Sequence, residues 1–345
     1  MSSDVRSPCA ACAFQVILQA SSPSEYATAE AAFKRVLATP NLDARVRNLG
    51  GRTQHDLRRD LQEPTDAAHL FLQRLLYFIN RLNHFWFDEL DNYVNERSVV
   101  IASLRNTIEG AWAEWELQQL PASFVQHLQQ MHPDQIKREL DMRYEQHKEP
   151  PPSESGLYIA SETKLDGYRQ LLAVGSLDGL TEASRQSRVC AGAANPISNA
   201  VFRILMEVRR ILCKTKANKT LLNLVLQEYG SGQLSRKHST FYASMMRELG
   251  LSDKPETYLD LVPWQALAGA NHNFMLTETR RGYLRYLGAL TYFEIVGPSV
   301  CQNYVKAARR LGLSEAASWY WELHMKEDER HGKWMLQDVA KPAVD

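Results

Sequence analysis

The chain has 345 residues, which is enough for a sizeable core and, at usual domain sizes, for two domains. Its 40 lysines and arginines balance 40 aspartates and glutamates, so no net field draws the protein to nucleic acid or to an anionic membrane. No apolar run approaches the length of about 18 residues expected of a membrane span, and the start of the chain does not read as a signal peptide. We therefore expect a cytoplasmic protein with a small-molecule or protein partner, and no binding to nucleic acid or membranes.

The first half of the chain predicts helices. Residues 69–94 and 98–120 carry apolar side chains at three- and four-residue intervals, and no segment of useful length alternates with a period of two. The sequence therefore predicts an all-α fold. The proline-rich segment 145–156 stops a helix and offers no apolar face, so it predicts a division into an N-terminal auxiliary helical region, 1–150, and a C-terminal domain, 157–345.

The N-terminal region carries no cluster of candidate ligands. Its aromatic-rich stretch, 74–90, predicts packing against the C-terminal domain or a second subunit, and we expect a homodimer. In the second half, helices are expected at about 165–185, 196–214, 218–227, 236–250, 278–311 and 314–338. Two LGLS segments place Gly250 and Gly312 where the end of a helix favours a left-handed residue.

The last predicted helix contains the stretch YWELHMKEDERHGKWML, with His324, Asp328 and His331. At 100° per residue these three side chains lie at about 0°, 40° and −20°, so they share one face. The two histidines are separated by about 10.5 Å along the helix axis, whereas ligand bonds are only about 2.0 to 2.2 Å long. The spacing favours two ions about 3.5 to 4 Å apart, with one histidine on each and Asp328 between them. Glu327 and Glu329 point away from this face and are not expected to be ligands.

Such a dinuclear centre needs further ligands from other helices. Glu228 ends an apolar run, and His238 opens the next one after a glycine-rich break that lets the chain bend. Glu294 is the only acidic residue between Glu278 and Glu315 and is flanked by apolar side chains, so it is expected to be buried and paired, protonated or metal-bound. Imidazole and carboxylate ligands without sulfur favour iron or manganese over structural zinc.

Three segments, EYGSGQLSRKH, ALTYFEIVGPS and YWELHMKEDERHGKWML, together resemble the ligand-bearing segments of the haem-oxygenase-like diiron oxidases and oxygenases, the iron-containing redox enzyme family. The resemblance covers a domain-sized piece at the end of the chain. It implies a haem-oxygenase-like helical bundle, two ferrous ions and dioxygen as co-substrate. It assigns the ligands Glu228, His238, Glu294, His324, Asp328 and His331.

Some members of this family use one more glutamate, from the preceding helix, and Glu207 is the candidate here. Two ferrous ions carry four positive charges and the three assigned carboxylates carry three negative ones, so a fourth carboxylate would neutralise the centre. Arg203 and Arg210, however, stand where ordinary surface ion pairs with Glu207 would form.

For function, the resemblance implies an O₂-dependent oxidoreductase that acts on a small metabolite in a biosynthetic pathway, with N-oxygenation of an amino acid or amine ahead of the alternatives. These are oxidative carbon–carbon cleavage or decarboxylation of an amino acid or fatty acid. The alternative to an enzyme is a protein that binds metal without catalytic activity. An external electron donor is a further expected partner. Side chains near the ligands that could contact substrate are Arg285, Tyr292, Phe241 and Tyr242.

Two related classes of metal-binding protein fit the sequence less well. Ferritin-like dimetal proteins need a pair of ExxH motifs, and this chain has only DxxH sequences, at Asp66–His69 and Asp328–His331. No third ligand accompanies the first of these, so His69 is expected to be structural. Haem needs an axial histidine and an empty pocket, and carboxylates in the same core argue against haem.

Overall fold

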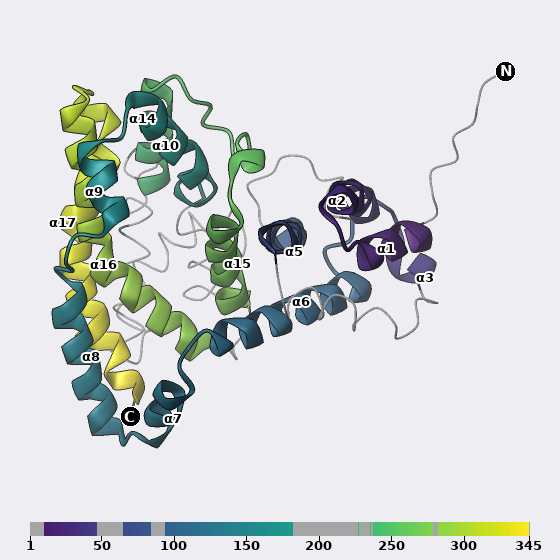
Figure 1. Cartoon of the computed structure of the whole chain (residues 1–345), viewed down its shortest axis with the longest axis horizontal. Coiled ribbons are helices and arrows are strands. Elements are labelled where there is room, and N and C mark those ends of the chain that lie inside the picture. The colour runs from purple at the N-terminus through teal and green to yellow at the C-terminus, as the bar shows by residue number, and fades with distance from the viewer. Residues whose placement is uncertain are drawn as a thin grey trace, which may run out of the picture. The chain divides into compact units, whose positions relative to one another are not determined.

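The computed structural model describes residues 10–46, 65–83, 94–181, 227, 235, 237–278 and 282–344. These residues form helices and no strand, which confirms the expected all-α class. Contacts divide the chain into two units, Met1–Gln126 with Pro263–His272, and His127–Val262 with Asn273–Asp345. Figure 1 labels the helices. None of the described helices combines the length and the hydropathy needed to cross a membrane.

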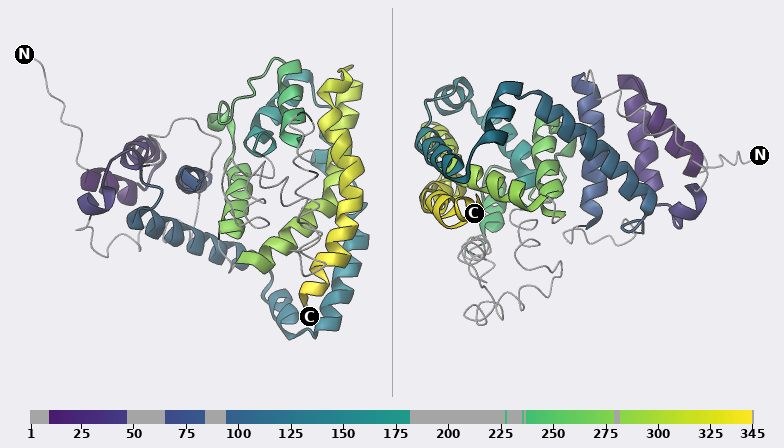
Figure 2. Two further views of the ribbon diagram at one scale, coloured as in Figure 1. Left: turned by 180° about the vertical axis from the view of Figure 1, so that it is seen from behind. Right: turned by 90° about the horizontal axis from the view of Figure 1, so that it is seen from below.

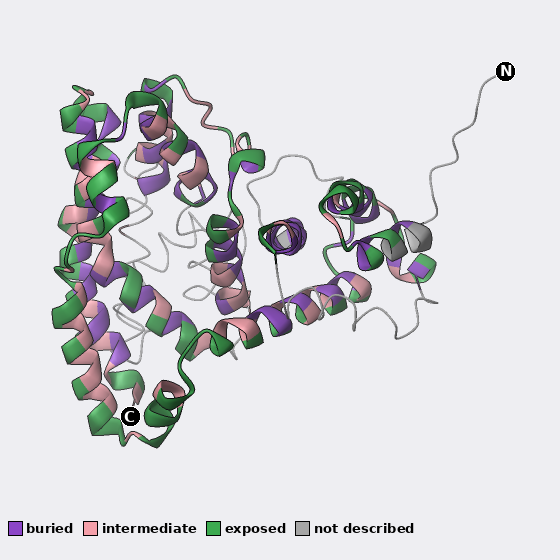
Figure 3. Cartoon of the chain, in the orientation of Figure 1, coloured by how far each residue is buried: buried purple, intermediate pink, exposed green. Residues whose placement is uncertain are grey.

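The first unit is built around a buried helix, α5 (Asp66–Asn80). Nearly every residue of α5 from Ala68 onward is buried, and Figure 3 draws much of this helix in the colour of buried residues. Its one buried guanidinium, Arg74, forms a two-point ion pair with Glu30, at 2.7 and 2.9 Å, which compensates the charge. The other elements of this unit are α1 (Ala10–Gln19), α2 (Pro23–Leu37), α3 (Leu42–Val46), η1 (Arg81–Asn83), α6 (Val99–Gln118) and the first part of α15 (Trp264–Glu278).

His69 lies in a cluster of tryptophans within the first unit. Its ring stacks on Trp264 at a centroid distance of 4.3 Å and meets Trp112 and Trp115 edge-on at 5.4 and 4.8 Å. The side chain is buried, and its Nδ1 atom makes no hydrogen bond to the described residues. The DxxH sequence therefore contributes to packing here: Asp66 accepts a hydrogen bond from Trp264 Nε1 at 2.9 Å.

We expect the stability of the first unit to depend on the charge of His69. Burial lowers the pKa of His69, and the nearby Asp66 opposes this only in part. The unfolded chain, with a histidine pKa of about 6.5, thus binds the proton more readily, so this contribution to stability is complete above about pH 6.5 and is lost as the pH falls. Urea midpoints followed by tryptophan fluorescence should fall between pH 7.5 and 5.5, and His69→Phe should flatten this dependence. The exposed His127→Gln serves as control, and a His69→Phe protein with unchanged pH dependence would contradict the assignment.

The second unit contains the long helix α16 (Tyr283–Arg310), which is antiparallel to α17 (Trp319–Trp334) and packs closely against it. Figure 2 shows the two helices side by side along part of their length. The other elements of this unit are α8 (Pro133–His147), α9 (Glu154–Ser161), α10 (Leu165–Gly179), α14 (His238–Glu248), η5 (Leu259–Leu261), η7 (Glu315–Ala317), the π-helical η8 (Met335–Ala340) and η9 (Pro342–Val344). The short helix α7 (Ala122–Gln130) precedes α8.

Helix α8 packs with the second unit although it precedes the proline-rich segment. Asp141 on α8 pairs with Lys341 near the C-terminus at 2.5 Å, and α8 also contacts α16 and η8. The division of contacts at residue 126 thus differs from the division at 150 to 157 that the proline-rich segment predicts. The prolines end α8 as expected, but they lie between two helices of the same unit.

Both predicted glycine-terminated helices end as expected. Gly250 and Gly312 adopt φ angles of 71° and 67°, in the left-handed region, directly after α14 and α16.

Within α16, Pro298 cannot donate the usual hydrogen bond to the carbonyl of Glu294, one turn earlier. Figures 1 and 2 show that α16 changes direction along its length, for which an internal proline is an ordinary cause.

The apolar core of the second unit lies between α10, α14 and the start of α17. Tyr168 and Tyr242 are almost completely buried there, and their hydroxyls donate to the carbonyls of Ala317 and Leu172 at 3.1 and 2.7 Å. Trp321 Nε1 donates to the Tyr168 hydroxyl at 3.0 Å, and burial raises the pKa of Tyr168. This packing fixes α14 against α17, the helices that carry His238 and His324.

Candidate metal centre

The three candidate ligands on α17 lie on its buried face, as the spacing predicts. His324, Asp328 and His331 are 8%, 6% and 0% exposed, and they share the buried side of α17 with Tyr320 and Gly332. Glu294 on α16 is only 8% exposed, which confirms the expected burial of this carboxylate. Unpaired charges are costly at such positions, so these residues must compensate one another or hold a cation.

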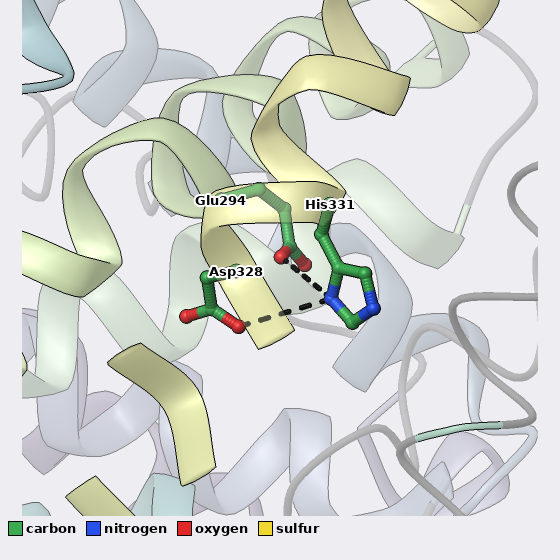
Figure 4. Close-up of side chains that lie close together, drawn as sticks. All are labelled: Glu294, Asp328 and His331. Atoms are coloured by element: carbon green, nitrogen blue, oxygen red, sulfur yellow. Dashed lines mark ion pairs between the residues drawn. The ribbon is translucent and has the colours of Figure 1, made fainter. Parts of the chain in front are cut away.

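One group of donor atoms consists of Glu294, Asp328 and His331, whose ligand atoms lie within 4.8 Å of one another. Figure 4 shows these side chains turned toward a common point, Glu294 from α16 and the other two from α17. His331 Nδ1 lies 3.2 Å from Glu294 Oε2 and 3.8 Å from Asp328 Oδ1, yet among the residues that the structure describes it has no hydrogen-bond partner. If Nδ1 carried a proton, it would be expected to donate a hydrogen bond to one of these carboxylates.

The other ring nitrogen of His331 indicates which tautomer is present. Nε2 contacts the amide oxygen of Gln227, which can only accept a hydrogen bond, so this contact fits the tautomer that has its proton on Nε2. The lone pair of Nδ1 is then directed toward two carboxylates. Electron-rich atoms repel one another in such an arrangement unless a cation lies between them, so this group fits a metal ion.

A second pair of donors is formed by His238 at the start of α14 and His324 on α17. His238 Nδ1 lies 3.3 Å from His324 Nε2, at hydrogen-bond distance, and both rings are buried; without a metal ion His238 Nδ1 donates to His324 Nε2. His324 Nδ1 lies 2.9 Å from the carbonyl oxygen of Tyr320, which requires a proton on Nδ1 and leaves the lone pair on Nε2. The fold thus brings together two histidines that are 86 residues apart in the chain.

The donor separations are compatible with ligands that share an ion. Two atoms bonded to one ion at about 2.1 Å cannot be more than about 4.2 Å apart. The separations of 3.2 and 3.8 Å in the first group and 3.3 Å in the second satisfy this limit. His331 and His324 belong to different groups, as the dinuclear hypothesis requires. The expected ligands Glu228 and Glu207 lie outside the described residues.

Glycines allow α16 and α17 to approach closely at the donors. A Cβ atom on Gly297 of α16 would lie 2.5 Å from Asp328 Oδ2. A Cβ atom on Gly332 of α17 would lie 2.9 Å from the carbonyl oxygen of Glu294 and 3.1 Å from the Cα of Ile295. Both contacts are shorter than real side chains tolerate, so these two positions favour glycine for steric reasons.

The sequence does not reveal Gln227 as a contributor, because a glutamine beside the candidate ligand Glu228 carries no charge or spacing signal. We expect Gln227→Ala to weaken metal binding by about 10- to 100-fold, the usual effect of removing the hydrogen-bond partner of a ligand histidine. Titration with Mn²⁺ measures this, with the exposed Gln337→Ala as control. Equal affinities for the two variants would show that the contact does not orient His331.

Glu327 also lies near the outer nitrogen of His331. Its Oε2 atom is 3.9 Å from His331 Nε2.

A pocket of about 500 Å³ opens on the first donor group, with Glu294 and Asp328 in its wall. The four predicted substrate contacts do not line it. Tyr242 is 1% exposed in the apolar core, which gives it a packing role, and Phe241 packs on Trp319. Arg285 and Tyr292 are exposed on α16, where Tyr292 packs edge-on against His147.

Comparison with known proteins agrees with the resemblance. Residues 192–345, which carry the described donors, match the family described as iron-containing redox enzymes. This C-terminal region is therefore similar to that family. The helical architecture is consistent with its haem-oxygenase-like fold. The chain is also similar to a nitrosourea synthase of Streptomyces achromogenes subsp. streptozoticus, with 24% identity over 168 residues. The similarity covers 49% of this chain but only 31% of that protein, so the relative is much longer than the matched part.

Proposed function

We propose that the C-terminal region is a nonhaem diiron oxidoreductase that uses dioxygen to oxidise a small metabolite. The observation that carries the proposal is the presence of two buried groups of donors, His331 with Glu294 and Asp328, and His238 with His324. The proposed ligand set is completed by Glu228, with Glu207 as a further candidate. The match of residues 192–345 to a family of iron-containing redox enzymes supports iron over manganese as the metal.

Two ferrous ions held there would supply the electrons for the reduction of dioxygen. The residues of the chain have separate tasks around them. Gln227 and the carbonyl of Tyr320 hold the protons on the outer nitrogens of His331 and His324, so the inner nitrogens keep their lone pairs. The donors themselves are buried, and the low local dielectric of such positions strengthens electrostatic interactions within the site.

For the reaction, we propose N-oxygenation of an amine-bearing metabolite. Support comes from the relative, whose name denotes the synthesis of a nitrosourea, a compound with a nitrogen–oxygen bond. A cytoplasmic location, a homodimer and an external electron donor remain parts of the proposal that follow from the sequence.

The test is the reaction of the ferrous protein with dioxygen. Addition of oxygen to protein reconstituted with Fe²⁺ should consume O₂ and give a transient visible absorption, and mass spectrometry with ¹⁸O₂ should detect a labelled product from a panel of amino acids and amines. Binding of iron without O₂ consumption would favour a non-enzymatic metal-binding protein. Labelled or cleaved products from fatty acids alone would contradict N-oxygenation.

A further inference from the structure

A series of aromatic rings leads from His324 to the surface of the second unit. The ring of Tyr320 lies 4.3 Å from the ring of His324 and 4.8 Å from that of Trp321, measured between centroids. Trp321 in turn stacks on Tyr304 of α16 at 4.4 Å, with 16° between the ring planes. These separations are close contacts for aromatic rings. An unbroken series of ring contacts thus connects a proposed metal ligand with Tyr304.

The exposure of these rings increases along the series. His324 and Tyr320 are buried, whereas Trp321 and Tyr304 are partly exposed. Tyr320 is also fixed to the ligand through its backbone, because its carbonyl oxygen accepts the hydrogen bond from His324 Nδ1. The series therefore runs from a buried ligand to rings that an electron donor in solution can reach.

The series of rings is separate from the pocket beside Glu294 and Asp328. The end of α8 forms one wall of that pocket through residues such as Tyr144, and residues of α16 and α17 form other parts of it. None of the rings in the series is among the described residues that line the pocket. A substrate in the pocket and an electron donor beside Tyr304 can therefore reach the donor groups by different routes.

The side chains at the outer end of the series suit the transfer of single electrons. Indole and phenol rings lose one electron more readily than the ring of phenylalanine does. Trp321 Nε1 donates a hydrogen bond to the Tyr168 hydroxyl at 3.0 Å, so an oxidised Trp321 can keep its proton on this bond. Burial raises the pKa of Tyr304, so its phenol is protonated, and its partial exposure lets water accept that proton when the ring is oxidised.

We propose that Tyr304 and Trp321, through Tyr320, form a one-electron route that reduces the metal centre when dioxygen has oxidised it and no substrate is bound. One electron passes from Trp321 across the ring of Tyr320 to the oxidised centre. Tyr304 then returns one electron to Trp321, and its phenolic proton goes to water. A one-electron reductant in solution, such as ascorbate, reduces the Tyr304 radical, which takes a proton back from water. This inference rests on the proposed function, because an oxidising centre is what such a route serves.

Flash oxidation of the anaerobic protein tests the route without dioxygen. A photo-oxidised ruthenium tris-bipyridine complex in solution removes single electrons from exposed tyrosine and tryptophan side chains, and transient absorption follows the radicals. Because the route conducts in both directions, a ferrous centre should return the missing electrons. In the wild-type protein, the radicals should disappear faster with bound Fe²⁺ than with bound Zn²⁺, which has no redox chemistry, and ferric iron should form as they disappear.

Two substitutions interrupt the route while keeping a ring at each position. Tyr304→Phe should reduce the accelerating effect of iron, and the double variant Tyr304→Phe, Trp321→Phe should abolish it. The matched control is Trp319→Phe, at a 55% exposed position of the same helix whose ring packs on Phe241 and is not part of the series. This control should retain the full effect. Affinity for Fe²⁺ should be the same in all variants, which separates electron transfer from a change in the donors.

The possible outcomes separate the route from the proposed function. An absent effect of iron in the wild-type protein, or an undiminished effect in the double variant, would overturn the route. O₂ consumption together with an absent effect would refute the route alone. An effect of iron that depends on Trp321 and Tyr304, in a protein that does not consume O₂, would refute the proposed function and leave the route intact.

Discussion

Replacement of Asp328 with alanine is expected to weaken metal binding by at least about 100-fold, whereas Glu329→Ala should leave it within about twofold of the wild type. Asp328 is 6% exposed and lies between the two histidines of α17 in sequence, with its Oδ1 atom 3.8 Å from His331 Nδ1. Glu329 is exposed on the adjacent position of the same helix. Even the loss of an outer partner of a ligand costs about 10- to 100-fold, so the loss of a direct ligand should cost more.

Mn²⁺ titration monitored by calorimetry measures this difference, and circular dichroism verifies that both variants remain helical. The two substitutions differ by one residue on one helix, so general effects on α17 are matched. If the variants bound metal equally well, the donors would have to lie on another face of the helix, and the centre described above would be wrong.

The second large effect is expected from Gly332→Ala. The new Cβ atom would lie 2.9 Å from the carbonyl oxygen of Glu294, a backbone atom that cannot rotate away. Helices α16 and α17 must separate to admit it, at a cost of about 1 to 3 kcal/mol in the free energy of unfolding, typical of overpacked cores. The separation also moves Glu294 away from His331, so metal binding should weaken together with stability.

Gly288→Ala on α16 is the matched control. A Cβ atom at this position meets nothing within 4 Å, and the residue is exposed in the helix interior. Alanine should therefore stabilise the helix by about 0.5 to 1 kcal/mol without changing metal binding. Urea unfolding and Mn²⁺ titration of both variants give the two quantities. A Gly332→Ala protein as stable as Gly288→Ala would mean that the helices are not in close contact at this point.

The sequence predicts well which side chains share the buried face of one helix. Helical periodicity alone places His324, Asp328 and His331 on one face, and that face is buried on α17. A single acidic residue in a long apolar stretch predicts the burial of Glu294, which is observed. These predictions succeed because they depend on the geometry of one helix and on the cost of burying a charge.

Features that depend on contacts between distant segments were not predictable in the same way. The approach of His238 to His324 depends on the packing of α14 against α17, and no spacing in the chain encodes it. The sequence does not predict helix α15, since Gly269, Asn271 and His272 interrupt its apolar pattern. The packing of α8 with the second unit, and its contribution to the pocket, likewise follow from tertiary contacts such as the pair of Asp141 with Lys341.

Tyr242 illustrates a further limit. An aromatic residue close to a candidate ligand is compatible with a pocket or with a core, and only the fold distinguishes the two. Here the tyrosine hydroxyl reaches the carbonyl of Leu172 and the ring packs against Tyr320, so the residue belongs to the core.

Anaerobic equilibrium dialysis with Fe²⁺ tests most directly whether the chain holds two ions in two groups of donors. The wild-type protein should bind two ferrous ions per chain. His324→Ala, which removes a donor from the pair with His238, should retain one tightly bound ion held by Glu294, Asp328 and His331. A wild-type protein that saturates with one ion, or a His324→Ala protein that still binds two with unchanged affinity, would contradict the dinuclear centre.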